Sequence, residues 1–82
     1  MTTLKIKSFT QYKTISDEIG LLALDVSNNE TVLLTIEREF LTKFKRSHKS
    51  SKNGILTVKA FHLGETTVNN KSTNYYSYLN HY

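Results

Sequence analysis

A basic segment in the middle of the chain carries the side chains best suited to bind a ligand. Residues 43–52 hold five of the eleven Lys and Arg residues and no acidic residue. The five are Lys43, Lys45, Arg46, Lys49 and Lys52. Such a concentration of positive charge attracts phosphates, an anionic membrane or an acidic protein surface. We take these residues as candidate nucleic-acid-binding residues, with a plain solvated surface as the alternative.

The aromatic C-terminus is a second candidate contact surface. In an extended segment, Tyr76 and Tyr78 share one face, and Tyr75 and Leu79 share the other. Tyrosine rings beside a basic groove could stack on unpaired bases, and tyrosine is also common at the centre of protein interfaces. We therefore name Tyr76 and Tyr78 as candidate stacking or interface residues. The interpretation that we favour is that they pack on the core or on a second copy in a homodimer.

The sequence predicts neither a metal site nor a catalytic centre. His48, His62 and His81 lack the short spacing that metal-binding histidines share. The chain contains no cysteine, and it has no glycine-rich phosphate loop or nucleophile elbow. We expect a non-enzymatic protein without a cofactor.

Length and composition predict one small domain. The 82 residues are enough for a single domain over residues 1–82 with one core. The absence of cysteine suits a reducing compartment, and the N-terminal residues lack the apolar run of a signal peptide. The longest apolar stretch, residues 21–24, is far shorter than the ~20 residues of a membrane span. We expect a cytoplasmic protein with no membrane partner.

Hydrophobic periodicity predicts a strand and then a helix in the first twenty residues. Alternation in residues 2–7 indicates a half-buried strand. Ser8 and Gln11 match a capping box, and apolar residues then recur at helical spacing. Gly20 stands where a helix would end in a left-handed residue. We therefore predict a helix over residues 9–19.

Two β-compatible apolar runs, residues 21–26 and 31–36, are predicted to pair as a hairpin. The residues between them include an Asn-Asn pair, which tolerates the positive φ of a tight turn. The predicted buried face consists of Leu22, Leu24, Val26, Val32, Leu34 and Ile36. The opposite face, with Leu21, Ala23 and Leu33, is not cleanly polar, so it is either covered or a contact surface.

Residues 37–49 fit either a helix or a strand, and we favour the helix. A helix aligns Phe40, Leu41 and Phe44 in one apolar stripe and places acidic residues in its first turn and basic residues in its last. In a strand, the basic run would become a hairpin tip. Further along, residues 55–63 indicate a strand, 64–74 a polar loop and 74–82 a final extended segment.

The predicted order is strand, helix, strand, strand, helix, strand and an aromatic tail. Under the right-handed crossover rule, this order gives an α+β fold, a ferredoxin-like β-α-β-β-α-β split sandwich with a C-terminal aromatic strand or tail. The alternative is a small OB or SH3-like β-barrel, with residues 40–53 as a long basic loop.

The function expected from these features is nucleic-acid binding or association, with phosphates contacted by residues 43–52. Sequence specificity should be low, because no cluster of Arg or Asn is placed to read base edges. The second interpretation is a protein-protein interaction module, such as a compact phage-type inhibitor or regulator of a host protein. The mixed apolar face and the aromatic tail favour that interpretation.

Overall fold

The computed structural model describes residues 1–15 and 17–81. Within these residues the chain forms five strands, one α-helix and one short 3-10 turn. In chain order, they are β1 (Thr2–Ile15), β2 (Glu18–Asp25), β3 (Glu30–Glu37), α1 (Arg38–Lys49), η1 (Lys52–Gly54), β4 (Leu56–Val68) and β5 (Lys71–His81).

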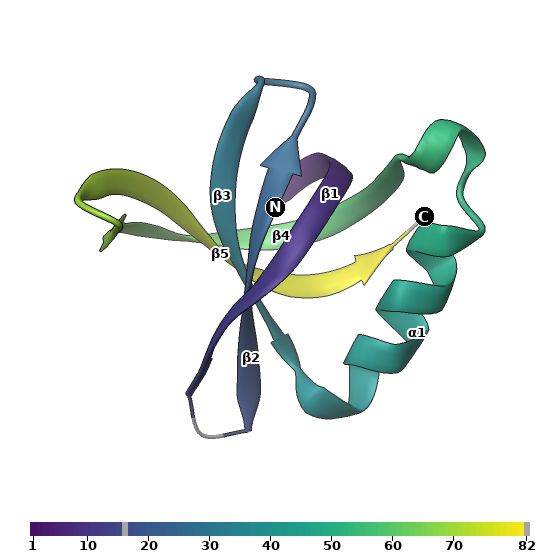
Figure 1. The fold of residues 1–82 in the computed structure, drawn as a ribbon, viewed down its shortest axis with the longest axis horizontal. Coiled ribbons are helices and arrows are strands. Elements are labelled where there is room, and N and C mark those ends of the chain that lie inside the picture. The colour runs from purple at the N-terminus through teal and green to yellow at the C-terminus, as the bar shows by residue number, and fades with distance from the viewer. Residues whose placement is uncertain (16, 82) are drawn as a thin grey trace.

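The strands form a closed barrel in the order β1-β2-β3-β5-β4, and β1 closes it by pairing with β4. Every pair is antiparallel except β3 and β5, which run parallel at Leu33–Tyr75 and Thr35–Ser77. In Figure 1, α1 lies along one side of the barrel, and the β4–β5 hairpin projects from the opposite side. A five-stranded barrel with this strand order and a helix between β3 and β4 has the topology of an OB-fold.

The ferredoxin-like prediction is therefore wrong, because the chain is mostly sheet and contains one α-helix within its described part. The barrel corresponds in outline to the alternative architecture. It differs from that alternative because residues 38–49 are a helix and not a loop. The predicted first helix is absent from the described residues because β1 and β2 pair as an antiparallel hairpin up to Ile15 and Glu18.

The predicted helix over residues 9–19 belongs instead to β1 and β2, with residue 16 outside the described part. Its helical spacing comes from irregular pairing: the register between β1 and β2 shifts between Ile6 and Ser8 and again between Gln11 and Lys13. Each shift adds one residue to β1, so side chains on the same face, which normally recur every two residues, are three residues apart there. Phe9 thus packs against the core after Ile6, although it is three residues further along.

The hairpin of β2 and β3 forms as predicted, but β2 buries the opposite face. Leu21 and Ala23 are fully buried and pair with Leu34 and Val32. Leu22 and Leu24 are instead half-exposed on the outside. The turn occupies residues 26–29, between the paired Asp25 and Glu30. A turn of four residues sets odd-numbered residues of β2 opposite even-numbered residues of β3, whereas the predicted face combined even-numbered residues of both strands.

The predicted helix of residues 37–49 is confirmed as α1, which buries Leu41 and Phe44. The Phe44 ring is fully buried and meets the rings of Phe9 and Tyr78 edge-on, at centroid distances of 5.0 and 5.6 Å. Phe40, expected in the same stripe, is 43% exposed. The buried face of α1 is therefore narrower than predicted, and Phe44 is its main anchor in the barrel.

Strand β4 runs past the predicted end at residue 63 and forms a long hairpin with β5. The predicted loop over residues 64–74 is the distal part of this hairpin. Asn69 and Asn70 form its turn, both with positive φ, as in the two-residue turns that match strand twist. Residue 82, the last of the predicted final segment, lies outside the described residues.

Candidate nucleic-acid interface

The five predicted basic residues lie on α1 and on the turn that follows it. Lys43, Lys45, Arg46 and Lys49 belong to α1, Lys52 begins η1, and all five are exposed. Within residues 1–15 and 17–81, none of them is held by an ion pair or a side-chain hydrogen bond. Their charges therefore face solvent and are open to an anionic ligand.

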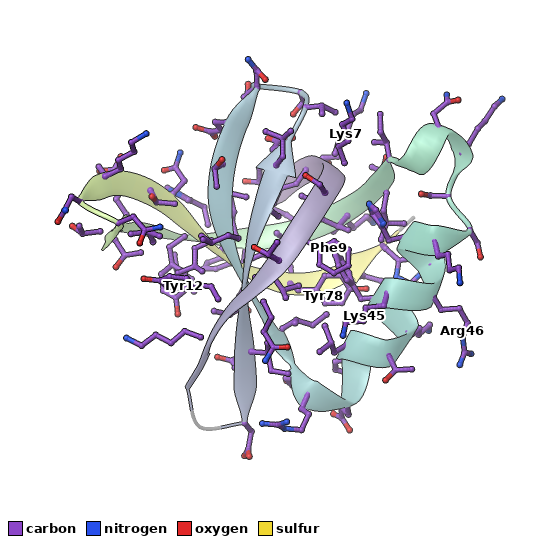
Figure 2. All side chains as sticks on the ribbon, in the orientation of Figure 1. Lys7, Phe9, Tyr12, Lys45, Arg46 and Tyr78 are labelled. Atoms are coloured by element: carbon purple, nitrogen blue, oxygen red, sulfur yellow. The ribbon has the colours of Figure 1, made fainter. Side chains whose placement is uncertain are left out.

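These cations spread around the exposed side of α1 and do not converge on one point. With 3.6 residues per turn, Arg46 lies nearly opposite the buried Phe44, while Lys43 and Lys45 lie on opposite flanks. In Figure 2, Lys45 lies on the side of α1 that faces the strands, and Arg46 points away from the barrel. The four cations on α1 thus form a convex positive surface, whereas Lys52 lines a depression beyond the end of the helix together with Ser47, Ser50 and Ser51.

Strand β1 extends this positive surface away from the helix. Lys5, Lys7 and Lys13 are exposed along β1. The strand adjoins the C-terminal half of α1, because Nε2 of His48 lies 2.8 Å from the carbonyl oxygen of Lys7, and the His48 ring contacts Phe9. Lysines on β1 therefore continue from the last turns of α1 toward the far end of the strand.

A groove on the outer face of the sheet is the second feature of the site. It encloses about 140 Å³ and is lined by Tyr12, Lys13, Gly20, Leu33, Thr35, Thr66 and Tyr75. We call it the tyrosine groove. In Figure 2, Tyr12 lies on the side of the barrel away from α1, so the groove and the convex basic surface are separate.

The strand order explains how the groove is built. Gly20 on β2 and Leu33 on β3 form its floor, while Tyr12 on β1 and Tyr75 on β5 stand on the flanking strands. Tyr75 pairs directly with Leu33. A Cβ at Gly20 would lie 3.1 Å from the Lys13 carbonyl oxygen and 3.4 Å from Cδ1 of Leu33. A side chain at this position would therefore crowd the floor of the groove, and glycine leaves that space open.

The tyrosines named from the sequence lie elsewhere. Tyr76 is a core residue, 6% exposed, and burial raises its pKa, with further contributions from Glu30 and Asp25. Tyr78 packs against Phe44, and burial raises its pKa as well. Both rings are occupied by packing, Tyr76 in the core cluster and Tyr78 against Phe44.

The sequence named the two tyrosines of β5 that pack inward as possible contact residues, and it did not point to Tyr75 or Tyr12 as groove residues. Alternation along β5 already separated Tyr75 from Tyr76 and Tyr78, but it could not say which face was outside. One residue in the sequence could have pointed to this outer face. Leu33 is apolar, although it lies on the face of β3 that was not predicted to be buried.

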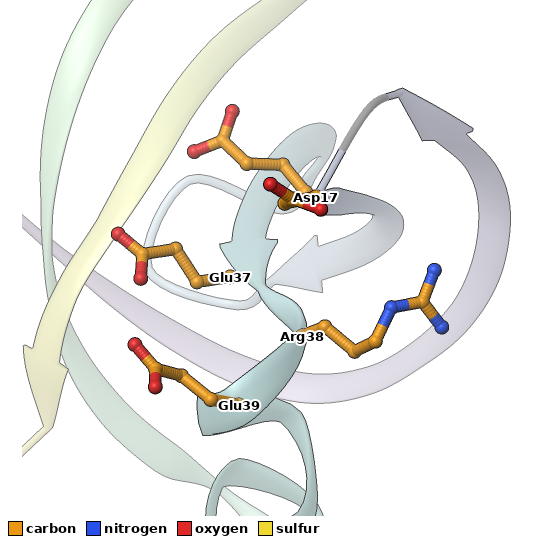
Figure 3. A pocket seen from close by; sticks show the side chains of 5 residues that line it. Asp17, Glu37, Arg38 and Glu39 are labelled. Atoms are coloured by element: carbon orange, nitrogen blue, oxygen red, sulfur yellow. The ribbon is translucent and has the colours of Figure 1, made fainter.

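An acidic cluster bounds the site at the start of α1. Asp17, Glu18, Glu37, Arg38 and Glu39 line a depression there, and Figure 3 shows the Arg38 side chain pointing away from the carboxylates. Glu18 and Glu37 are direct cross-strand partners. A side-chain hydrogen bond with Glu39 raises the pKa of Glu37, and partial loss of hydration and the charges of Glu39, Glu18 and Asp17 raise it further.

Replacing Glu37 with glutamine should therefore stabilise the protein at neutral pH. A raised pKa means that Glu37 binds its proton more readily in the folded state than in the unfolded chain. The ionised side chain therefore lowers the free energy of unfolding at pH values above its folded pKa. This loss disappears at pH values below its unfolded pKa. Thermal melts should show a higher Tm for Glu37→Gln near pH 7 and no difference near pH 3, below the ordinary glutamate pKa of about 4.3.

Glu65→Gln is the matched control for this prediction, because it removes one negative charge from β4, outside the cluster. Its Tm at the two pH values measures the effect of removing one negative charge away from the cluster. A gain in Tm for Glu37→Gln that is the same at both pH values would contradict the explanation by charge.

No family model, curated protein or solved structure was found to match the chain. In the part of the chain that the structure describes, no helix is long and apolar enough to cross a membrane. Any function must therefore be argued from the basic surface, the tyrosine groove and the acidic cluster themselves.

Proposed function

We propose that the protein is a small, non-enzymatic nucleic-acid-binding protein of low sequence specificity. The observation that supports this function is the set of exposed cations on α1, η1 and the first half of β1. They are Lys5, Lys7, Lys43, Lys45, Arg46, Lys49 and Lys52. Lys13, further along β1, lines the tyrosine groove. A phosphate backbone is the ligand that a long, convex and positive surface fits best, because it is itself an extended line of charges.

Binding at this surface would be driven by the release of counterions from the phosphates. Six of the seven cations are lysines, which act as point charges, whereas an arginine fork can hold two acceptors of a base at once. Such a surface holds the backbone in several orientations and reads little sequence. With four to five phosphate contacts, raising salt from ~50 to ~200 mM should weaken duplex binding by roughly a few hundredfold.

The acidic cluster limits where the nucleic acid can lie. Glu37 and Glu39 stand at the start of α1, and the basic residues follow from Lys43 onward. Phosphates are repelled at one end of the helix and attracted at the other. We therefore place the nucleic acid over the C-terminal half of α1 and along β1.

The double variant Lys45→Gln/Arg46→Gln should bind a single-stranded oligonucleotide of about 12 nucleotides roughly 20-fold more weakly than the wild type at ~100 mM salt. Two lost phosphate contacts account for this factor, and they should also reduce the slope of log K against log salt by about 1.4. Fluorescence anisotropy of a labelled oligonucleotide, titrated at several salt concentrations, measures both quantities.

The matched control is Arg38→Gln/Lys71→Gln, which removes the same charge from the acidic end of α1 and from the β4–β5 turn. It should change the affinity only slightly. Equal losses in the two variants would show that net charge alone matters. A wild-type titration that stays flat at low salt would refute the function.

A second candidate function, a protein-interaction module, is favoured by the outer face of the β4–β5 hairpin. Phe61, Leu63 and Leu79 are 54%, 48% and 51% exposed there. Half-exposed large apolar side chains grouped on two paired strands are typical of protein contact surfaces. If the oligonucleotide titration is flat at low salt, this face becomes the better-supported site.

A further inference from the structure

We propose that the tyrosine groove binds one unpaired base, so that the protein prefers single-stranded to duplex nucleic acid. This inference rests on the proposed function and adds a substrate class to it. It assigns base contacts to Tyr12 and Tyr75, which lie outside the basic surface of α1.

The size and lining of the groove fit one planar ring. Its volume of about 140 Å³ is below the ~300–1,000 Å³ of pockets that enclose a whole drug-sized ligand. Tyr12 and Tyr75 supply aromatic surfaces on both sides, and Leu33 and the bare backbone of Gly20 supply an apolar floor. Base stacking on aromatic side chains needs such surfaces and tolerates any base, because every base has a π-face.

The polar groups around the groove suit the backbone of a stacked nucleotide better than its base edge. Lys13 follows Tyr12 on β1 and is exposed, so its ammonium group can meet a phosphate outside the groove. The hydroxyl of Thr35 is already engaged, since it donates to the carbonyl oxygen of Tyr76 at 3.1 Å. The other hydroxyl groups in the lining belong to Thr66, Tyr12 and Tyr75. A hydroxyl both donates and accepts, so these groups should discriminate only weakly between bases.

Charge also sets the direction in which the strand leaves the groove. Glu18 lies two residues before Gly20 on β2, and it pairs with Glu37 on β3. This acidic pair repels phosphates from that end of the groove. Lys13 and Lys7 lie along β1 instead, so the strand should follow β1 toward the C-terminal half of α1.

A duplex cannot use the groove without losing a base pair. Its bases are stacked and paired, and extruding one costs a few kcal/mol. The basic surface on α1 contacts phosphates, which both forms of nucleic acid display. The groove therefore adds affinity for single strands alone.

The variants Tyr12→Ala and Tyr75→Ala should each weaken binding of a labelled single-stranded oligonucleotide by about 5- to 150-fold. Binding of a duplex of the same length should be unchanged in the same anisotropy assay. Tyr12→Phe keeps an aromatic ring and should restore most of the loss. Phe61→Ala removes an aromatic ring that is 54% exposed on β4, outside the groove, and serves as the matched control.

A second measurement keeps the test valid if an alanine variant loses stability. In the wild-type protein, NMR signals of the Tyr12 and Tyr75 ring protons should move upfield when the oligonucleotide is added, because a stacked base shields them. Unmoved ring signals would overturn the inference.

The outcomes separate this inference from the proposed function. If the tyrosine variants bind single strands as the wild type does, while Lys45→Gln/Arg46→Gln binds weakly, the groove is not a base site and the function stands. Equal loss of single-strand and duplex binding would also overturn the inference. Absence of all binding at low salt would overturn the function itself.

Discussion

Replacing Phe44 with alanine should lower the free energy of unfolding by about 3–5 kcal/mol, the usual cost of deleting a fully buried phenylalanine. The ring is 0% exposed and lies between Phe9 and Tyr78. Alanine would leave a cavity where α1 meets the barrel. Domains of this size have total stabilities of about 5–15 kcal/mol, so the variant should be close to unfolding at physiological temperature.

Urea unfolding followed by circular dichroism measures this loss. Phe40→Ala is the matched control, since it makes the same change one turn earlier on the same helix, at a side chain that is 43% exposed. The control should cost well under half as much. Equal losses in the two variants would contradict the role of Phe44 as the anchor of α1.

This anchor bears on function because α1 carries most of the proposed phosphate contacts. His48 and Ser47 add polar contacts to the same attachment. The His48 ring meets β1, and Ser47 Oγ lies 3.1 Å from Nε2 of His81, whose Nδ1 is 2.7 Å from the Tyr78 hydroxyl. These contacts hold both ends of the chain against the helix, so weakening Phe44 should also loosen the connection between the cations of α1 and those of β1.

Replacing Asp25 with alanine should cost about 2–4 kcal/mol, the second-largest loss of stability that we expect. The side chain is fully buried, and its carboxylate accepts four hydrogen bonds. Its Oδ1 atom accepts from the backbone N–H of Lys5 at 3.0 Å, from the backbone N–H of Ser27 at 3.2 Å and from the Ser27 hydroxyl at 2.7 Å. Alanine would leave these donors without an acceptor.

Asp25→Asn is the informative companion variant, because its amide oxygen can still accept from the backbone groups. Its loss of stability should be clearly smaller in the same urea experiment. An asparagine variant as unstable as the alanine variant would show that the negative charge matters more than the acceptor. An alanine variant as stable as the wild type would contradict the structural role altogether.

Asp25 also positions part of the proposed interface. It ties the turn of residues 26–29 to β1 at Lys5, next to the shift in register at residues 6–8, and the backbone N–H of Val26 donates to the Lys5 carbonyl oxygen at 2.9 Å. The course of β1 depends on this junction. Lys7 and Lys13 both lie beyond it on the same strand.

The amino-acid sequence by itself determined the features that depend on near neighbours. Helix α1 follows from an apolar stripe and from an order of charges that matches the helix dipole, and both signals lie within thirteen residues, 37–49. The pairing of β2 with β3 follows from two apolar runs around an Asn-Asn turn. The exposed cations of residues 43–52 follow from composition alone, because burying so many charges is unfavourable.

Only the tertiary structure decided the features that depend on distant partners. Residues 9–15 are a strand because β2 supplies their hydrogen-bond partners, and the shifts in register that give this segment a helical spacing exist only in the pairing. The buried face of β2 depends on its register with β3, which sets odd-numbered residues of β2 opposite even-numbered residues of β3. The tyrosine groove needs β1 and β5 on either side of β2 and β3. This arrangement comes from the pairing of β1 with β2 and of β3 with β5, and local sequence does not encode the second of these pairings.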